Sequence, residues 1–311
     1  MKDIAIVILN YNTYDLTVDC VNSILAQDYP SKNMRIIIVD NFSTDDSLEK
    51  LKNQYHNTDI ILLSSKRNLG FANGNNLGIL YARERLNISN IFLVNSDILF
   101  LDKNLITTLM NNIDNNVAVI GPEIFNINNE PAYLSRLDLV SYKNQKKDYL
   151  SRSIYLKIRN QKLLYKLYKL LKKNRKAYIA PIYKGCSYRN EEVSDSMWIP
   201  GCAFLLTENY FKNYKMLYPY TFMYYEESIL AYLCKKKNLK LKYIKSVHLL
   251  HKDGKSTETI KIADDDKNIR KLQWMADSSK ILLKVIKKNA ALIDREIVRF
   301  SLSLENDAVI Y

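Results

Sequence analysis

The sequence of 311 residues lacks an apolar run of the roughly 18–20 residues that a membrane-spanning helix needs. Its N-terminal apolar run, Ile4–Leu9, is short and no small-residue cleavage site follows it, so it predicts a first strand instead of a signal peptide. The four cysteines form neither a CxxC pair nor a metal-ligand spacing, which indicates reduced, buried thiols. With 47% hydrophobic and 25% charged residues the composition is that of a globular protein, which we expect in the cytosol.

Two familiar phosphate-binding motifs are also missing. No Gly-Lys-Ser/Thr sequence occurs, which argues against a P-loop NTPase, and no GxGxxG sequence marks a dinucleotide site. Asn10-Tyr-Asn12 follows the first apolar run, where a sugar-nucleotide pyrophosphorylase would carry a glycine-rich loop with Arg and Lys. A nucleotide site in this chain would therefore be built from other residues.

The positive charge is unevenly distributed. The formal net charge is +13, but residues 143–189 hold fifteen Lys or Arg and one acid, Asp148. This segment contributes +14, so the rest of the chain carries −1. Outside this one basic segment the chain is therefore near neutral.

Apolar runs and amphipathic stretches alternate along the first 120 residues. We predict strands at 4–9, 35–40, 60–63, 91–94 and 117–120, and helices at 13–27, 43–55, 75–86 and 103–112. Such alternation is typical of βαβ units around a mainly parallel sheet. Beyond residue 122 we expect strands at 203–207 and 241–247, a helix at 226–237, and helical sequence from 264 to 299.

Acids follow two of the predicted buried strands. Asp97 follows Ile91-Phe-Leu-Val-Asn-Ser, and Asp40 ends Arg35-Ile-Ile-Ile-Val. Ligands bind at the carboxyl ends of strands in open α/β sheets. There Asp97 could hold a hard cation that binds a diphosphate, and Asp40 could bind ribose hydroxyls or a base edge. The alternatives are an ordinary loop aspartate at 97 and a loop cap at 40.

Three further segments carry candidate chemistry. Asn68–Asn76 places glycines and amides before a helix, which suits phosphate binding. Glu226 and Glu227 begin a helix among aromatic residues, where burial would raise a carboxyl pKa toward that of a general base; the alternative is a helix cap. His251 follows a strand and is a candidate metal ligand, with a packed core histidine as the alternative.

Seven segments together resemble a family 2 glycosyltransferase, one of the inverting enzymes of GT-A fold. They follow the family's order over residues 3–258 and are Val7-Ile-Leu-Asn-Tyr-Asn12, Ile38-Val-Asp-Asn41, Asn68-Leu-Gly-Phe71 through Asn76, Phe92-Leu-Val-Asn-Ser-Asp97, Gly201-Cys-Ala-Phe-Leu-Leu206, Phe222-Met-Tyr-Tyr-Glu-Glu227 and His251-Lys-Asp-Gly-Lys-Ser256. The chain is most similar to the bacterial subgroup that builds surface polysaccharides and includes rhamnosyltransferase-like members. The resemblance implies an α/β GT-A fold with a mainly parallel sheet flanked by helices.

The resemblance also implies a role for each matching residue. Asp40 would bind the nucleoside, and Asp97, at the family's DxD motif, would hold a Mn²⁺ or Mg²⁺ ion that bridges the diphosphate. His251 would help to hold the metal, and Glu227 stands at the position of the catalytic base. The other residues expected to bind the donor are Asn10, Asn12, Asn68, Gly70, Asn76, Asn95 and Ser96.

Two positions depart from the family pattern. Asn95 stands where the first acid of the DxD motif usually stands, which lowers the local negative charge and predicts weaker metal binding. Ile229 stands where the family often has a further acid, which calls an acceptor contact through that acid into question.

The implied reaction is a single in-line displacement with inversion. Glu227 would take the proton of an acceptor hydroxyl as its oxygen attacks the anomeric carbon of a UDP- or dTDP-sugar, with rhamnose as one candidate. The cation would stabilise the departing diphosphate. The acceptor would be a glycan or a polyprenyl-linked oligosaccharide of a bacterial surface polysaccharide such as a capsule. Two other functions stay open: a catalytically inactive scaffold of this fold, and a polyanion-binding protein that uses the basic segment.

Residues 152–176 interleave leucines at helical spacing with lysines, a pattern typical of an amphipathic helix at a membrane surface. We expect this segment to dock the protein on the anionic inner leaflet, where a lipid-linked acceptor would lie. The alternatives are a helix that packs its leucines on the core or on a second subunit and, least favoured, nucleic-acid binding.

The expected domain organisation follows from these segments. Residues 1–259 would form the transferase domain, with a nucleotide-sugar half at 1–122 and an acceptor half at 123–259. The acceptor half would contain the basic helical insertion at about 141–190. Residues 260–311 would form a helical extension that covers the sheet or mediates self-association.

Overall fold

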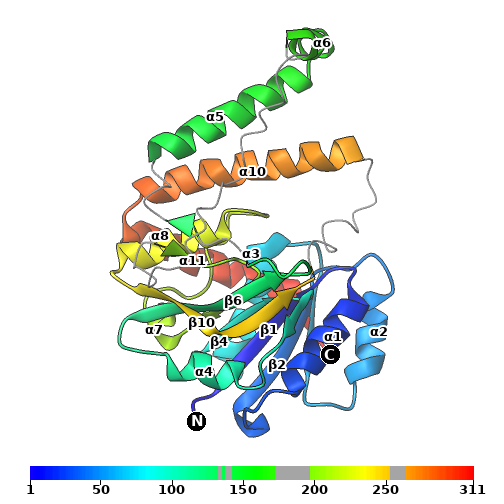
Figure 1. Cartoon of the computed structure of the whole chain (residues 1–311), viewed down its shortest axis with the longest axis vertical. Helices are drawn as coiled ribbons and strands as arrows, with labels where there is room; N and C mark the ends of the chain where they lie inside the picture. Colours follow the sequence, from blue (N-terminus) through cyan, green and yellow to red (C-terminus); the bar gives the residue numbers. More distant parts are fainter. Residues whose placement is uncertain (132–134, 137–141, 172–196, 253–263) are drawn as a thin grey trace.

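The computed structural model describes residues 1–131, 135–136, 142–171, 197–252 and 264–311 (Figure 1). Its centre is a nine-stranded sheet in the order β11-β3-β2-β1-β4-β9-β6-β10-β5. The strands are β1 (Ile4–Asn10), β2 (Met34–Asp40), β3 (Ile61–Ser65), β4 (Ile91–Asn95), β5 (Ile98–Phe100), β6 (Val117–Asn126), β9 (Ala203–Leu206), β10 (Lys240–His251) and β11 (Ala308–Ile310). A separate pair joins β7 (Ser135–Arg136) to β8 (Met197–Trp198). The predicted α/β fold is confirmed.

Strands β3, β2, β1 and β4 form a parallel block. β1, β2 and β4 consist mostly of buried apolar residues because helices cover both faces of the sheet. Their register pairs Asn10 with Asp40 and places Asn95 opposite Leu9. The carboxyl ends of these strands therefore meet at one edge of the sheet, as the sequence predicted.

Alternate strand residues supply two apolar cores. Ile4, Ile6 and Ile8 of β1 pack with α1 (Tyr14–Leu25), α2 (Ser47–Tyr55) and α4 (Leu105–Asn111). Ala5 and Val7 face the opposite side and pack with α3 (Gly70–Glu84), α8 (Glu226–Lys236), α10 (Asp264–Lys287) and α11 (Ala290–Leu304). Alternate side chains of β1 thus face opposite sides of the sheet, and each side is covered by its own layer of helices.

The sheet is mixed, but six of its nine strands run in one direction, as expected of a mainly parallel sheet. β9 runs antiparallel between β4 and β6, while β6 and β10 are parallel to each other. Edge strands β5 and β11 are antiparallel to their neighbours as well. The simple βαβ pattern ends after β4, because β9 enters the sheet only after a long excursion of the chain.

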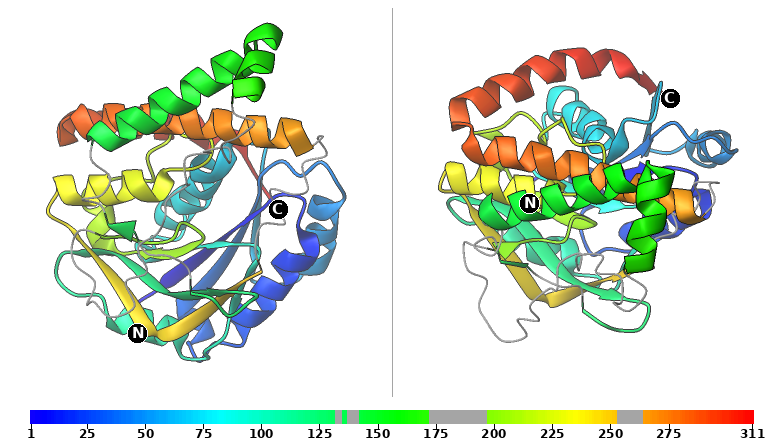
Figure 2. Two further views of the ribbon diagram at one scale, coloured as in Figure 1. Left: turned by 45° about the horizontal axis from the view of Figure 1, so that its top comes forward. Right: turned by 90° about the horizontal axis from the view of Figure 1, so that it is seen from above.

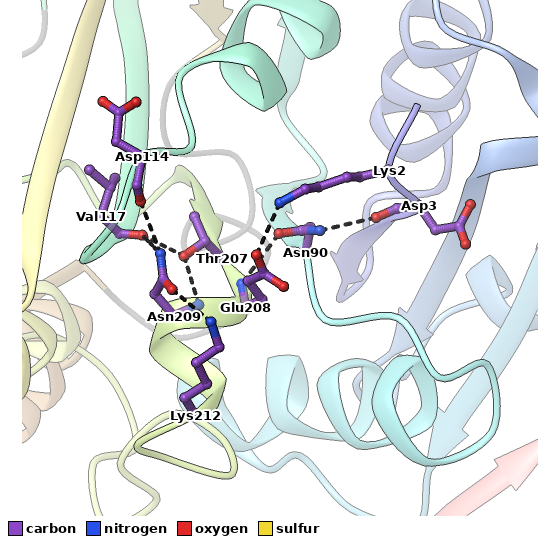
Figure 3. A network of polar contacts seen from close by, with 9 residues as sticks. All are labelled: Lys2, Asp3, Asn90, Asp114, Val117, Thr207, Glu208, Asn209 and Lys212. Atoms are coloured by element: carbon purple, nitrogen blue, oxygen red, sulfur yellow. Dashed lines mark hydrogen bonds and ion pairs between the residues drawn. The ribbon is translucent and has the colours of Figure 1, made fainter.

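A polar network fixes β9 at the edge opposite the carboxyl ends of β1 and β2 (Figure 3). Thr207 caps α7 (Glu208–Phe211) by accepting from Asn209 N at 3.2 Å, and its hydroxyl donates to Val117 O at 2.6 Å. Glu208 N donates to Asn90 Oδ1 at 3.3 Å. These bonds tie the end of β9 to the starts of β4 and β6.

Helix α3 begins five residues earlier than the helix predicted at 75–86. It starts at Gly70, whose φ is +75°. A Cβ at Gly74 would lie 2.5 Å from Leu9 Cδ1, and one at Gly78 would lie 2.4 Å from Val7 Cγ1. The glycines therefore let the helix lie close on β1, so most of the amide-rich segment is helix.

The C-terminal residues form more than the single helical stretch expected at 264–299. Helices α10 and α11 are separate, and β11 follows them and pairs antiparallel with β3, with Ala308 opposite Ser65. Lys66 Nζ donates to Asn306 O at 2.8 Å beside this pair. The C-terminal residues thus complete one edge of the sheet.

The basic segment begins with two helices joined by a short turn, α5 (Tyr142–Arg159) and α6 (Lys162–Leu171). We call this pair the α5–α6 hairpin, or basic hairpin. α5 packs along α10, and the hairpin lies beyond α10 on the side away from the sheet (Figures 1 and 2). The rest of the predicted insertion, residues 172–190, lies outside the described residues. None of the helices that the structure describes is both long enough and apolar enough to cross a membrane.

Candidate active site

The carboxyl ends of β1 and β2 form the first part of the site, around Asp40. Asp40 is buried, and its Oδ1 accepts from Asn10 Nδ2 at 2.7 Å and from the Ser43 hydroxyl. Its Oδ2 accepts from Ser43 N at 3.0 Å. One acceptor position of Oδ2 is left without a partner in the described residues. Asp40 thus caps its loop, which is the alternative interpretation of this residue.

Asn10 connects Asp40 to the turn after β4. Asn10 Oδ1 accepts from Thr13 Oγ1 at 3.1 Å and from Thr17 Oγ1 at 2.8 Å. Thr13 Oγ1 in turn lies 2.9 Å from Ser96 Oγ. Because both donors and both acceptors of the Asn10 amide are in use, this side chain organises Asp40 and Ser96 and does not point to open space.

Asn12 joins the loops that follow β1 and β2. Its Oδ1 accepts from Thr44 N at 2.7 Å and its Nδ2 donates to Thr44 Oγ1 at 3.1 Å, while its own backbone lies at φ 56°. The same loops line a cavity of about 260 Å³ formed by residues 12–16, 45–47 and Lys50. Asn12 therefore lies at the wall of an open cavity beside Asp40's loop.

Asp97 and His251 meet where β4 turns into β5. β5 pairs with β10 so that Ile98 stands opposite His251, which brings His251 Nε2 to 3.3 Å from Asp97 Oδ2. Lys252 N donates to Asp97 O at 2.9 Å. Asp97 is buried, and its Oδ1 has no hydrogen-bond partner in the described part of the chain. The two predicted metal ligands are therefore neighbours.

These residues fit a divalent cation. A buried carboxylate oxygen without a partner is costly unless a cation or donor reaches it. Where the chain is described, no group of three or more His, Cys, Asp or Glu converges. Mg²⁺ is commonly held by one or two carboxylates and takes its other ligands from phosphate and water, a pattern that Asp97 fits. His251, whose imidazole is a common type of metal ligand, lies beside Asp97.

The loop before α3 forms the next part of the site. Asn68 Oδ1 accepts from Gly70 N at 3.0 Å, and Asn41 Oδ1 accepts from Leu69 N at 2.9 Å. Phe71 N donates to Phe222 O at 2.7 Å. Gly70 thus lies against the backbone of Phe222, so this glycine joins two loops.

Asn76 lies deeper in the fold than a donor-binding role would need. It is fully buried, its Nδ2 donates to Leu217 O at 3.1 Å, and its Oδ1 accepts from Leu217 N at 2.9 Å. The structure thus gives Asn76 a tethering contact to the chain before Phe222.

The loop Phe222–Tyr225 presents the two glutamates. Tyr224 and Tyr225 both have φ of 72°, a left-handed conformation that costs non-glycine residues about 1–2 kcal/mol each. Such strain persists only where the surroundings hold the backbone, and it often marks a functional site. Helix α8 begins directly after Tyr225, and Glu226 and Glu227 are its first two residues.

The two glutamates face different surroundings. Glu226 lines a cavity of about 10 Å³ with Tyr210 and Leu217, and its Oε1 is buried. Burial, and then the charge of Glu227, raise the pKa of Glu226 to about 8. Burial also raises the pKa of Glu227, whose Oε2 would lie 3.4 Å from a Cβ at Gly201. Glu227 therefore faces Gly201, and Glu226 faces the core.

The segment Gly201–Cys202 lies between Glu227 and the turn after β4. Cys202 O accepts from Asn95 N at 2.8 Å, and a Cβ at Gly201 would lie 3.4 Å from Glu227 Oε2. Because β9 is antiparallel to β4, its first residues lie at the edge where β4 ends. This edge therefore collects Asp40, Asn95–Asp97, His251 and Glu227.

The sequence missed several residues that build the site. Thr13, Thr17, Asn41 and Ser43 hold predicted residues in place, and Arg152 of α5 donates to the hydroxyl of Tyr225. The polar residues after β1 and β2 were visible in the sequence, but the bonds that join their loops to one another, to the loop before α3 and to the turn after β4 link residues 29 to 83 positions apart. Residues 253–256 of the last predicted motif lie outside the described residues.

Comparison with protein families identifies the chain. The pattern of the family described as "Glycosyl transferase family 2" matches residues 5–163, half of the 311 residues. The chain belongs to glycosyl transferase family 2. This family 2 match contains Asp40 and Asp97 and ends before Glu227 and His251.

A curated relative agrees with the family 2 membership. The low-salt glycan biosynthesis hexosyltransferase Agl10 of Haloferax volcanii is 22% identical over 251 residues, which are 81% of this chain and 67% of that protein. The predicted glycosyltransferase is confirmed at this coarse level. The predicted sugar and the bacterial polysaccharide are not, since this relative is archaeal.

Solved structures agree in fold with this family 2 chain. Staphylococcus aureus TarS residues 1–349 in complex with UDP has a TM-score of 0.54 and 11% identity, covering 99% of this chain and 88% of that one. The complex of TarS 1–349 with UDP-GlcNAc has a TM-score of 0.51 and 13% identity, covering 96% of this chain and 71% of that one. The Pyrobaculum calidifontis mannosyltransferase PcManGT, in complex with GDP-Man and Mn²⁺, has a TM-score of 0.50 and 11% identity. The match covers 93% of this chain and 73% of that one. The predicted GT-A fold is confirmed.

Proposed function

We propose that this chain transfers a sugar from a nucleoside-diphosphate sugar to a hydroxyl of an acceptor, with inversion at the anomeric carbon. One observation supports this most strongly: Asp97, whose buried Oδ1 has no hydrogen-bond partner among the described residues, and Glu227, with a raised pKa, both lie at the carboxyl edge of one sheet. The strand end that leads to Asp97 bonds to Cys202, and Glu227 lies beside Gly201, so the segment Gly201–Cys202 lies between the two acids. Such a pair can act on opposite ends of a breaking bond.

The donor would lie across the ends of β1, β2 and β4. Asp40 Oδ2 keeps an acceptor for a base or ribose donor group, and Asn68 Nδ2 makes no hydrogen bond within the described residues. The cavity beside Asn12 is lined by Asp15, Asp45 and Asp46, so it suits a base or ribose better than a phosphate. The diphosphate would then extend toward Asp97.

Asp97 and His251 would hold a divalent cation at the diphosphate. When bound, such an ion supplies positive charge that stabilises the departing nucleoside diphosphate. Asn95 stands in the place of a second carboxylate, so we expect the cation to bind weakly without nucleotide and more tightly with it. GDP-Man and Mn²⁺ occur together in PcManGT, which supports this proposal.

Glu227 would be the general base. A base must be ionised to accept the proton of the acceptor hydroxyl, and a raised pKa makes it a stronger proton acceptor once ionised. Glu226 suits this role less, because it lines a core cavity and its pKa of about 8 keeps it mostly protonated at neutral pH. The adjacent glutamates thus have separate roles, one at the site and one in the core.

Nucleotide binding tests the proposal. UDP, dTDP, GDP and CMP are each added with and without Mn²⁺ or Mg²⁺, and thermal unfolding is measured. At a hundredfold excess over Kd a ligand stabilises the native state by about 2.7 kcal/mol. We expect one nucleotide to raise the unfolding temperature in a metal-dependent way, and Asp97→Ala to lose the metal dependence.

A matched control is Asp102→Ala, which removes an aspartate that follows the edge strand β5 and accepts from His248 N of β10, outside the proposed site. It should keep the metal-dependent shift. No shift with any nucleotide would turn the assignment toward a scaffold or a polyanion-binding protein.

We further propose that the acceptor is presented at an anionic membrane and that the α5–α6 hairpin docks there. Residues 142–171 hold nine Lys or Arg and one acid. Exposed apolar side chains lie among them, at Leu150 and Ile154 on α5 and at Leu164, Leu167 and Leu170 on α6. The hairpin lies farthest from the sheet (Figure 1). Basic groups near anionic lipid each contribute about 1 kcal/mol.

Vesicle binding tests the docking surface. The protein should sediment with phosphatidylglycerol-containing vesicles at low salt and much less with pure phosphatidylcholine or at high salt. Replacing Leu164, Leu167 and Leu170 by Ser should reduce sedimentation about tenfold or more, because apolar burial is lost. The control replaces the exposed Leu292 and Leu302 of α11 and should bind like wild type. Equal binding by both variants would contradict the proposal.

A further inference from the structure

Arg152 is the buried cation of helix α5. The buried residues of α5 are Gln145, Arg152 and Leu156, and Arg152 is 8% exposed. Buried arginines are usually paired with acids. In the described part of the chain no carboxylate pairs with Arg152; its Nη1 donates to the Tyr225 hydroxyl, and its guanidinium carbon lies 5.7 Å from the centroid of that ring.

Tyr225 occupies the position that sets the direction of α8. It is buried, left-handed in backbone conformation, and directly precedes Glu226 and Glu227. Its carbonyl accepts from Ile229 N at 2.9 Å, the first turn of the helix. A shift of Tyr225 would therefore move the start of α8 and with it the Glu227 carboxylate.

Helices outside the sheet hold every residue of this loop. α10 contacts the residues before Tyr225, and α5 contacts Tyr225 itself. The α10 contacts are Trp274 with the ring of Phe222 (5.0 Å between centroids), Ser278 Oγ with Met223 O (2.8 Å), and Lys271 Nζ with the ring of Tyr224 (5.7 Å). The left-handed turn is thus held by side chains from two helices.

We propose that Arg152 is a positioning residue for the base: through the Tyr225 hydroxyl it holds the turn that presents Glu227. The inference rests on the proposed role of Glu227. It makes α5, and hence the basic hairpin, a structural part of the active site. The contact also connects the proposed membrane-docking surface to the proposed base through the hydrogen bond between Arg152 and Tyr225.

The hairpin offers a matched control for the test. Arg159, seven residues further along α5, donates to the hydroxyl of Tyr165 on α6 and lies 4.5 Å from the centroid of that ring. Tyr165→Phe therefore removes the same kind of bond within the hairpin, away from the loop. Tyr225→Phe removes the bond to Arg152 and keeps the ring.

We expect Tyr225→Phe to lower kcat about 10- to 100-fold and to change KM for the donor less than about twofold, because misplacement of a catalytic group lowers the rate of chemistry without removing the donor site. Arg152→Lys should give an intermediate kcat. Tyr165→Phe should match wild type. A kcat for Tyr225→Phe equal to wild type, or an equal fall in Tyr165→Phe, would overturn the proposal.

A second readout separates this inference from the proposed function. Amide hydrogen exchange of residues 226–229 should be faster in Tyr225→Phe than in wild type or Tyr165→Phe, with the exchange of β1 unchanged. This holds whether or not the chain transfers sugar, so an inactive wild type would count against the proposed function alone. If Tyr225→Phe is unfolded, Arg152→Lys is compared by the same exchange; unchanged exchange there would overturn the positioning role.

Discussion

Glu227→Gln is expected to lower kcat by about a thousandfold, within the range of 10²–10⁴ typical for loss of a general base. Gln has nearly the shape of Glu, so the nucleotide-dependent thermal shift should stay that of wild type. In wild type, kcat should rise with pH and level off above the pKa of Glu227, which burial raises above its ordinary value. Steady-state kinetics across pH, with the sugar donor that binding identifies, measures both effects.

Glu226→Gln is the matched control for this base. Glu226 has a pKa of about 8, so Gln resembles its protonated form, and the variant should keep kcat within about threefold at neutral pH. A folded-state pKa raised from 4.5 means that the native state binds more protons than the unfolded state between these values. The free energy of unfolding of wild type should therefore fall as pH rises from about 4.5 to about 8, and Glu226→Gln should show less of this fall. An inactive Glu226→Gln beside an active Glu227→Gln would assign the base to Glu226.

Gly70→Ala is expected to lower the free energy of unfolding by roughly 2–5 kcal/mol, the sum of a left-handed backbone at about 1–2 kcal/mol and overpacking at about 1–3 kcal/mol. The added Cβ would lie 2.1 Å from Phe222 O, a backbone atom that cannot rotate away. The loop that carries Glu227 must therefore move or the start of α3 must unwind. We expect kcat to fall together with stability, measured by denaturant unfolding and by transfer rate.

Gly201→Ala is the control for this substitution. Its added Cβ would lie 3.4 Å from Glu227 Oε2, an ordinary contact, so stability should change by less than about 1 kcal/mol. Wild-type stability in Gly70→Ala would mean that the contact between α3 and the Phe222 loop relaxes without cost.

Much of the fold could be predicted from local sequence. The parallel block was predictable because β1, β2 and β4 are continuous apolar runs that end in polar residues, and the helices between them carry a clear apolar spacing. The antiparallel direction of β9 could not be predicted, because it depends on where the chain returns to the sheet after residue 127. The start of α3 was placed too late, since glycine and asparagine lower helix propensity and only packing on Leu9 and Val7 reveals their use.

The candidate site was predictable for residues at strand ends and much less so for their supports. Asp40 and Asp97 follow buried strands, and the register of β5 on β10 brings His251 to Asp97, which sequence spacing alone does not reveal. Arg152 carried no local signal, because one arginine in a basic segment looks like its neighbours until burial separates it from them. The roles of these residues in binding and catalysis stay predictions.

The pairing of β11 with β3 also has a consequence for the order of synthesis. Ala308 pairs with Ser65, so the third strand of the sheet waits for a partner that is made about 240 residues later. Until residues 308–310 have left the ribosome, the backbone groups along that side of β3 are an open edge that another chain could join. A nascent chain is therefore open to strand-mediated association along β3 while the roughly 240 residues between β3 and β11 are made, until β11 pairs with that edge.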